Sequence, residues 1–558
     1  MDLDSESSHM TDSGSDCSHG PDDPVHVPGD HTVDRWLSDS SEDRPLPPEQ
    51  IPVIDDDQNN GEWEDEDSDE DSVNDDDLST ESFLLDDSFQ VTVSHVCQHW
   101  REVALDTAPL WSQIDVETGK HAIQSYRRAS TYLSRTKEYP LSISIDVNES
   151  QEYLDDASLY SEQSDCLSAE TGAQLLAIMH LLLPHTGRWR TFKLTAEDYL
   201  RFHTVLSQLC SVGPASLLES LELHNYDEEV ESELHSFHHS NHKTPFVLFN
   251  NKAPKLRHVS FYGVHIDWHN TTFLKNLHSL ELAYLSQDVR PSFDNFFTIL
   301  RSSLELHTLD LCMAGPFGFP HEWPPFLPPP PQGDDYQDPN VPAAFSTKPP
   351  TLDEYLILPK LHELKLSHQS PEELAAFFNR VSMPSLQILE LYFVDHEYTD
   401  FIQSHLISPP KWQGGPSRES RLTNLKELRI TQLPCTPKAI ADLYATLVNL
   451  ETIDFDFNCL DKPFWTVLIP TGVRDVTTPA HLLLPALHTM KVKGSTGIVL
   501  RQIIQARVDV ELPLKKLIVD YNSSVEKEDD TWLRERVEQL EYFDVSDDDY
   551  VDDDESFG

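Results

Sequence analysis

The sequence predicts an α/β fold, in which a solenoid of short strands and helices follows a small helical unit and lies between disordered acidic ends. Three observations lead to this prediction. A phrase of the form L-x-x-L-x-L recurs ten times between residues 218 and 519. Apolar residues recur at helical spacing from residue 93 to residue 104, and a second apolar pair, Leu110 and Trp111, follows. Much of the net charge of −57 is concentrated at the two ends of the 558-residue chain.

The first part of the chain, residues 1–88, is rich in Asp, Glu, Ser and Pro. Residues 1–90 contain 30 acidic residues against Arg35 and Arg44, and residues 541–558 contain nine acids and no base. Such segments bury too little apolar surface to offset the entropy that is lost on ordering. We therefore predict a disordered acidic leader over residues 1–88 and an acidic tail over residues 544–558. This charge repels phosphate, which argues against direct binding of nucleic acid.

The second part, residues 89–135, is predicted to be a helical unit. Ser94 is placed to cap its main helix, and Pro109 ends that helix because proline disfavours helical geometry in the residue before it. Trp100 lies at the centre of the predicted apolar face, so replacing it with Ala should cost roughly 3–5 kcal/mol. The face consists of Val93, Val96, Trp100, Val103 and Ala104.

The sequence of this stretch, VCQHWREVALDTAPLW, also resembles that of a known family. They resemble the C-terminal half of fungal-type F-box and F-box-like domains, in which V-C-x-x-W-R-x-x-A-L precedes P-x-LW-like residues. The resemblance implies that this unit binds the Skp adaptor of a cullin ubiquitin ligase, while the downstream domain binds the substrate. It assigns adaptor binding to Leu46, Pro47, Val96, Cys97, Trp100, Leu110 and Trp111.

One departure from the F-box pattern motivates an alternative. The family begins with an L-P-x-E-I/L-L helix, and here Pro52 interrupts the phrase that Leu46 and Pro47 open. Proline cannot lie inside a continuing helix, and an acidic run then fills the place of the next helix. The chain could therefore be an interaction scaffold without ligase association. The acidic leader motivates a third class, an acidic histone-binding protein, in which residues 1–88 would bind basic histones.

The third part, residues 136–543, contains the recurring phrase. Its last two apolar positions lie two residues apart, so both point to one face of a short strand, and the first position closes the turn into that strand. One unit cannot bury this face alone, whereas stacked units bury it together. The phrases occupy residues 218–223, 256–261, 277–282, 306–311, 361–366, 386–391, 425–430, 450–455, 487–492 and 514–519, after an earlier member at 189–194.

Further strands and helices are predicted around these phrases. Residues 141–145 alternate between apolar and polar and predict a strand, and residues 171–183 predict an apolar core helix that is too short to span a membrane. Together they form the expected first repeat. Helices are also predicted between phrases, at residues 371–378 and 437–443.

The array resembles the irregular leucine-rich repeats found behind F-box domains. The resemblance implies a leucine-rich-repeat solenoid whose strands line a concave face that holds a protein substrate. A helical stripe over residues 532–543 is expected to cap the C-terminal end. Residues 315–350 form a proline-rich insertion, which is either solvated or a polyproline II ligand for an SH3- or WW-like partner.

Charged residues alternate with the apolar positions of the strands and should face the substrate. The candidate substrate-facing residues are Glu222, Glu281, Asp310, Lys365 and Glu390. Because the first three are acidic, a basic partner segment would be steered to the Glu222–Asp310 side, with an affinity that falls as salt rises. The alternative is that these charges only keep an exposed sheet soluble.

The sequence offers no catalytic, cofactor or metal motif. G-x-S-x-G, Walker, H-E-x-x-H and C-x-x-C patterns are absent, so we expect a non-enzymatic protein without a cofactor. Four histidines between residues 235 and 242 are predicted to lie in a solvated loop rather than at a metal. Seven scattered cysteines, no signal peptide and no apolar run of membrane-spanning length predict a cytoplasmic or nuclear protein without a membrane partner.

Overall fold

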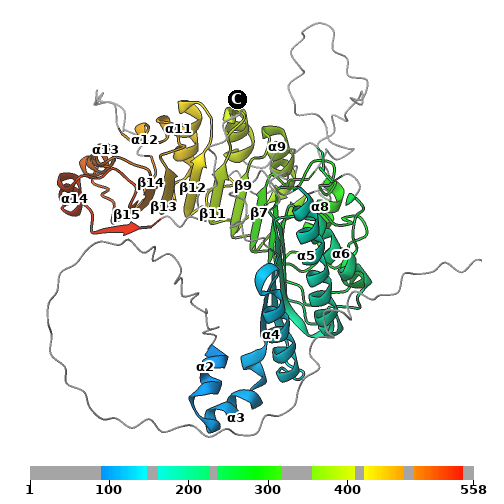
Figure 1. Cartoon of the computed structure of the whole chain (residues 1–558). Coiled ribbons are helices and arrows are strands. Elements are labelled where there is room, and N and C mark those ends of the chain that lie inside the picture. Colours follow the sequence, from blue (N-terminus) through cyan, green and yellow to red (C-terminus); the bar gives the residue numbers. More distant parts are fainter. Residues whose placement is uncertain are drawn as a thin grey trace, which may run out of the picture. The chain divides into compact units, whose positions relative to one another are not determined.

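The computed structural model describes residues 89–147, 161–226, 236–239, 242–316, 355–408, 420–469 and 483–544 (Figure 1). The predicted leader with Leu46 and Pro47, most of the proline-rich insertion, and the predicted tail beyond Asp544 lie outside the described residues. The predicted α/β class is confirmed, because one long sheet and a set of helices make up the described chain.

Fourteen parallel strands form a single sheet, and their order along the sheet follows their order along the chain. Two further short strands, β8 (Leu356–Ile357) and β10 (Val381–Ser382), pair with each other. The strands of the main sheet are β1 (Gln113–Glu117), β2 (Leu141–Val147), β3 (Trp189–Ala196), β4 (Ser220–Asn225), β5 (His258–Tyr262), β6 (Ser279–Ala283), β7 (Thr308–Cys312), β9 (Glu363–Ser367), β11 (Ile388–Tyr392), β12 (Glu427–Gln432), β13 (Thr452–Asp456), β14 (Thr489–Lys493), β15 (Lys516–Asp520) and β16 (Gln539–Phe543).

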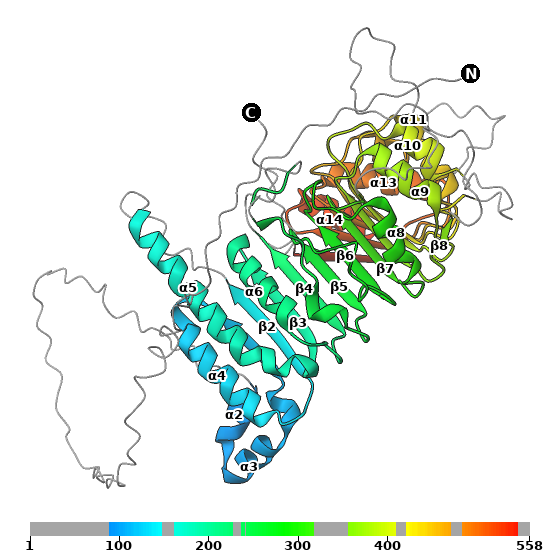
Figure 2. The same ribbon diagram turned by 90° about the vertical axis from the view of Figure 1, so that its right-hand side faces the viewer.

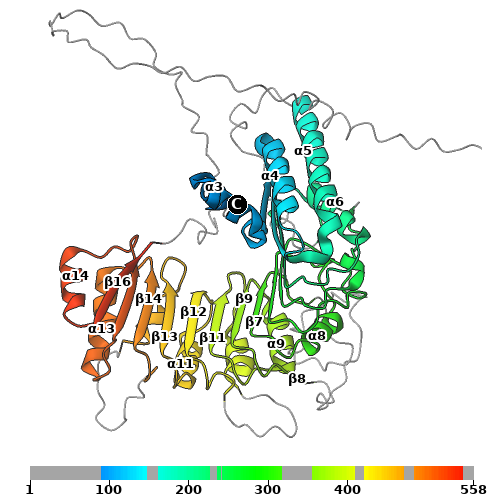
Figure 3. The same ribbon diagram turned by 90° about the horizontal axis from the view of Figure 1, so that it is seen from below.

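Parallel neighbours require crossover connections, and most crossovers here contain a helix or a helical turn. Figures 2 and 3 show these helices on one side of the sheet, which curves away from them. The helices are α2 (Phe89–Val96), α3 (Gln98–Asp106), α4 (Ala122–Arg135), α5 (Ser161–Leu182), α6 (Tyr199–Ser211), α8 (Phe293–Arg301), α9 (Pro371–Arg380), α10 (Thr399–Phe401), α11 (Pro437–Thr446), α12 (Pro463–Thr466), α13 (Gly497–Asp509) and α14 (Lys527–Arg534). Shorter helical turns are η1 (Ala108–Trp111), η2 (Gly119–His121), η4 (Leu183–Arg188), η6 (Leu248–Asn251) and η8 (Ile402–Leu406).

The recurring phrases form the core of the sheet. Each of the ten ends in a strand, and the first apolar residue of every phrase is at most 2 % exposed. The other two apolar positions align across neighbouring strands, as Leu223 does with Phe261 and Leu282. Each strand therefore buries its apolar face against the strands beside it and the helices that cover them. The strand at residues 141–145 and the helices at residues 171–183, 371–378 and 437–443 are confirmed as well.

Both ends of the sheet differ from the sequence prediction. The stripe predicted as one helix over residues 532–543 is wrong: α14 ends at Arg534, and β16 pairs in parallel with β15. Pairing with β15 places Leu540 beside Leu517 and Tyr542 beside Val519, so these apolar residues extend the core of the sheet. At the other end the sheet begins with β1, inside the range that we assigned to the helical unit. No helix of the described segments is long and apolar enough to cross a bilayer.

Candidate protein-binding surfaces

The helices α2 and α3, called the helical pair below, are separated by a break at Cys97. The backbone of Cys97 is extended, with φ −163° and ψ 171°, so the residues before and after it do not share one continuous helical face. The prediction that Ser94 caps a helix is wrong. Ser94 lies inside α2, where its Oγ donates to the carbonyl of Val91 at 2.7 Å. Arg101 joins the two helices, because its Nε donates to the carbonyl of Ser94 at 2.9 Å.

The predicted apolar core of this unit is wrong for most of its members, since Ala104 is the only buried residue of α3. Trp100 is 51 % exposed and Val96 is 64 % exposed. The break at Cys97 interrupts the helical face, and no element among the described residues covers these side chains. Five of the fifteen exposed large apolar side chains in the described residues belong to the helical pair: Phe89, Val96, Trp100, Val103 and Leu105.

Trp111 anchors the helical pair to the sheet. It is fully buried, and its Nε1 donates to the carbonyl of Ala104 at 2.8 Å. The Tyr132 ring meets it edge-on at 5.1 Å between centroids, and the Arg135 guanidinium lies 4.2 Å from its ring centre. Leu110 is half-buried beside it. Of the predicted adaptor-binding residues, Val96, Cys97 and Trp100 are therefore exposed, whereas Trp111 holds the unit in place.

The predicted substrate-facing residues lie in one register across the sheet. Alternation along a strand places them opposite the buried positions, on the side that we call the polar face. The row contains seven acids and four bases, so it is acidic. Its members from β1 to β16 are Asp115, Ser144, Lys193, Glu222, Ser260, Glu281, Asp310, Lys365, Glu390, Arg429, Asp454, Lys491, Ile518 and Glu541.

Between β7 and β12 each carboxylate of the polar face described below lies within ion-pairing distance of a base. Lys365 Nζ lies 3.8 Å from Asp310 and 4.0 Å from Glu363. Arg429 contacts Glu427 at 2.7 Å, Glu390 at 3.1 Å and Glu363 at 3.3 Å. Desolvation raises the pKa of Asp310 to about 7, which Lys365 opposes and the neighbouring glutamates reinforce. Lys365 and Glu390 are thus parts of an ion-pair network.

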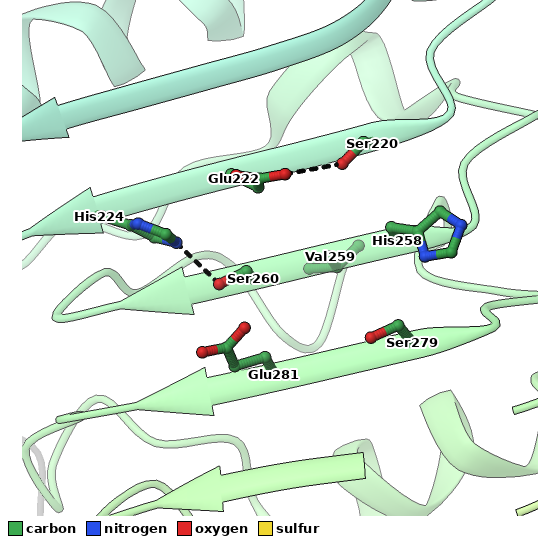
Figure 4. A pocket seen from close by; sticks show the side chains of 8 residues that line it. All are labelled: Ser220, Glu222, His224, His258, Val259, Ser260, Ser279 and Glu281. Atoms are coloured by element: carbon green, nitrogen blue, oxygen red, sulfur yellow. Dashed lines mark hydrogen bonds between the residues drawn. The ribbon is translucent and has the colours of Figure 1, made fainter. Parts of the chain in front are cut away.

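Between β4 and β6 the polar face is hollowed instead. Figure 4 shows Glu222 and Glu281 on the strands that flank β5, whose small Ser260 lies between them. The hollow has a volume of about 360 Å³, and His224 and His258 also line it. His224 Nε2 lies 2.8 Å from Ser260 Oγ, and Ser220 Oγ donates to Glu222 at 3.2 Å. No described base lies within ion-pairing distance of either carboxylate.

Three tyrosines beside the hollow were not identified from the sequence. The rings of Tyr226 and Tyr262 lie 4.7 Å apart, and those of Tyr262 and Tyr284 lie 4.6 Å apart. Tyr226 is exposed and the other two are half-buried. The tyrosines follow their phrases at three different distances, so no spacing reveals them. Tyr284 has a left-handed backbone with φ 52°. Its ring lies beside Tyr262, a contact between neighbouring segments that the sequence does not show.

The histidine-rich segment is partly packed rather than solvated. The His239 ring stacks on Tyr199 with centroids 5.3 Å apart, and the His242 ring meets His203 edge-on at 4.6 Å. His235 lies outside the described residues. Within the described ranges, no group of three or more His, Cys, Asp or Glu side chains is arranged to hold a metal ion. Cys97, Cys210, Cys312, Cys435 and Cys459 form no disulfide.

The sequence matches no protein-family model, and no curated protein matches it. The resemblances to F-box and leucine-rich-repeat proteins therefore rest on the residues quoted above.

Proposed function

We propose that this chain is a non-enzymatic substrate receptor of a Skp–cullin–F-box type ubiquitin ligase. The helical pair docks the Skp adaptor, and the polar face of the sheet holds a protein substrate. The observation that carries this proposal is the exposed apolar set of the helical pair, formed by Phe89, Val96, Trp100, Val103 and Leu105. It lies largely within the stretch that resembles the F-box phrase.

The energetics of apolar surface favour a partner at the helical pair. Removing apolar surface from water contributes about 25 cal/mol per Å². Several large apolar side chains gathered on two short helices forgo this stabilisation unless another protein covers them, and such surfaces mark interaction sites. Trp100 belongs to the residue type that most often dominates binding energy at interfaces. A protein adaptor with an apolar groove fits this surface.

The polar face supports the second half of the proposal. A curved sheet of fourteen strands presents a broad row of side chains, and its Glu222–Glu281 segment is hollowed and lacks ion-pair partners among the described bases. Binding surfaces of stacked repeats have this extended form. Substrate selection would therefore reside on β4–β6, while the paired network around Arg429 maintains the sheet.

Affinity capture of the full chain from cells, followed by mass spectrometry, tests the adaptor. We expect the Skp adaptor and cullin to co-purify with the wild type, and recovery to fall at least about tenfold for Val96→Asp combined with Trp100→Ala, which equals roughly 1.4 kcal/mol. The matched control is Ile498→Asp in α13, because Ile498 is also strongly exposed, at 67 %, but lies outside the helical pair.

Two outcomes would contradict the adaptor proposal. One is the absence of both adaptor and cullin from the wild-type capture, and the other is equal recovery with both variants. A stable partner whose lifetime does not depend on this chain would instead indicate the interaction scaffold.

A further inference from the structure

We propose that the hollow on β4–β6 binds an arginine side chain from an extended basic segment of the substrate. This inference rests on the proposed function, because it names the chemistry of the protein that the polar face would hold. Three independent features of the described residues lead to it: the spacing of Glu222 and Glu281, the absence of a neutralising base, and the row of tyrosines at the rim.

The spacing suits a flat cation. Parallel strands lie about 4.8 Å apart, so the backbones of β4 and β6 are roughly 10 Å apart across β5. Ser260 on β5 has a short side chain and is directed to His224 by a 2.8 Å contact. This leaves room above Ser260 for a guanidinium, which has five N–H donors in a planar fork and can donate to a carboxylate on each side.

The charge of the hollow remains uncompensated at neutral pH. Burial lowers the pKa of His224, so its imidazole is neutral at pH 7 and does not balance Glu222 or Glu281. Lys193 stands beside Glu222 in the row but lies beyond ion-pairing distance. Elsewhere on the polar face, the acids of β7 to β12 already have Lys365 or Arg429 as an ion-pair partner. An incoming cation is therefore attracted to β4–β6 more than to the rest of the row.

The tyrosines add a second kind of contact. Tyr226, Tyr262 and Tyr284 form a continuous row of rings, and Tyr226 also lies edge-on to His224 at 5.9 Å. Guanidinium groups stack favourably on aromatic faces. A second arginine or the stem of the first can lie on this row, which favours an extended segment over a single ion.

The test uses the full chain and a short peptide in which arginine alternates with serine, labelled with fluorescein and a photo-reactive group. Matched peptides contain lysine or citrulline in place of arginine, because citrulline keeps the shape of arginine and removes its charge. Cross-linked sites mapped by mass spectrometry separate binding at β4–β6 from any binding by the acidic leader. We expect cross-links on β4–β6, with arginine bound more tightly than lysine and citrulline not bound.

The variant E222Q/E281Q removes both carboxylates with little change of shape. We expect its cross-links on β4–β6 to fall at least about tenfold at roughly 0.15 M salt. The control D115N/E117Q removes the same charge from exposed positions of β1 on the same face, and should change them less than about twofold. Unchanged cross-links in E222Q/E281Q, equal losses in both variants, or equal binding of citrulline or lysine peptides would overturn the proposal.

Adaptor recovery measured in the same samples keeps the two proposals apart. E222Q/E281Q should retain the adaptor while losing the peptide. The variant with Val96→Asp and Trp100→Ala should lose the adaptor and still bind the peptide. This result would support adaptor binding by the helical pair and peptide binding by β4–β6. If the wild type binds the arginine peptide at β4–β6 but recovers neither adaptor nor cullin, the ligase proposal is wrong and the arginine site is supported.

Discussion

The helical pair and the sheet contain apolar residues at equally regular spacing, yet they expose them to opposite extents. In the sheet, the apolar positions of neighbouring phrases lie against one another, and residues such as Leu223 and Leu389 are fully buried. In the helical pair, Trp100 is half exposed although its spacing predicts a core. A strand within the array has neighbours on both sides, whereas the helical pair has other described elements on one side only. Periodicity shows which residues share a face, and only the neighbours in space decide whether that face is covered.

The two tryptophans of the helical unit provide the largest test of this difference. Trp111→Ala should lower the free energy of unfolding by about 3–5 kcal/mol, because it removes a fully buried ring and leaves a cavity. Trp100→Ala should cost less than about 1 kcal/mol, since much of its ring already contacts water. Urea denaturation measures both values, and hydrogen exchange of α3 and α4 locates the loss.

If both substitutions destabilised the protein equally, Trp100 would be part of a core and the contrast between the two regions would be wrong. In that case Trp100→Ala would also be unsuitable as an adaptor-binding variant.

Asp310→Asn sharpens the comparison on the sheet side. The pKa of Asp310 is about 7 in the folded protein, mainly because of desolvation, whereas an unfolded aspartate titrates near about 3.9. Between these values the folded chain binds the extra proton, so the free energy of unfolding falls as pH rises through this window. Asparagine removes the effect. The variant should match the wild type near pH ~4 and exceed its stability by roughly 1–3 kcal/mol above pH ~7.

The upper part of that range is reduced because 22 % of the Asp310 side chain stays exposed and water screens its charge. Denaturation across this pH range measures the difference, with the exposed Asp115→Asn on the same face as the control. A difference between the Asp310 variant and the wild type that does not change with pH would show that Asp310 is ionised throughout.

The smallest effects concern helix starts. Ser370 and Glu373 form a reciprocal capping box at α9, with both hydrogen bonds at 3.2 Å, whereas Cys97 begins α3 without a side-chain cap. Ser370→Ala should therefore cost about 1 kcal/mol, and Cys97→Ser should stabilise α3 by about 0.5 kcal/mol. Thermal unfolding measures both. A Cys97→Ser protein that is less stable than the wild type would show that the thiol makes a contact that serine cannot replace.

The strands of the sheet were predictable because the L-x-x-L-x-L motif recurs ten times, which chance does not explain. Two apolar residues at a spacing of two, preceded by a third, predicted each strand of the main sheet from β4 to β15, and β3 as an earlier member. The short strands β8 and β10, which pair outside the main sheet, were not predicted. The last strand, β16, was not predictable, since its apolar residues fit a helical stripe equally well. Its contacts with β15, such as that of Leu540 beside Leu517, distinguish the two, and the sequence around residue 540 does not show them.

The two surfaces were predictable to different degrees. Alternation placed Glu222, Glu281 and Asp310 in one row, and the register agrees. The hollow was not predictable from alternation alone, because its shape depends on the small Ser260 between two glutamates from other strands. The exposure of Trp100 required knowledge of the break at Cys97, where neither proline nor glycine marks the end of α2. Contacts between residues distant in sequence determine these features.

The strands β7 and β9 pair residue for residue, from Thr308 with Glu363 to Cys312 with Ser367, although residues 313–362 separate them along the chain. Their register is set by the strands themselves, and the free energy needed to close the connection grows only with the logarithm of its length. Residues can therefore be added to this connection at little cost in stability. It offers a place to graft a fluorescent reporter domain that would follow the protein in living cells without altering either surface.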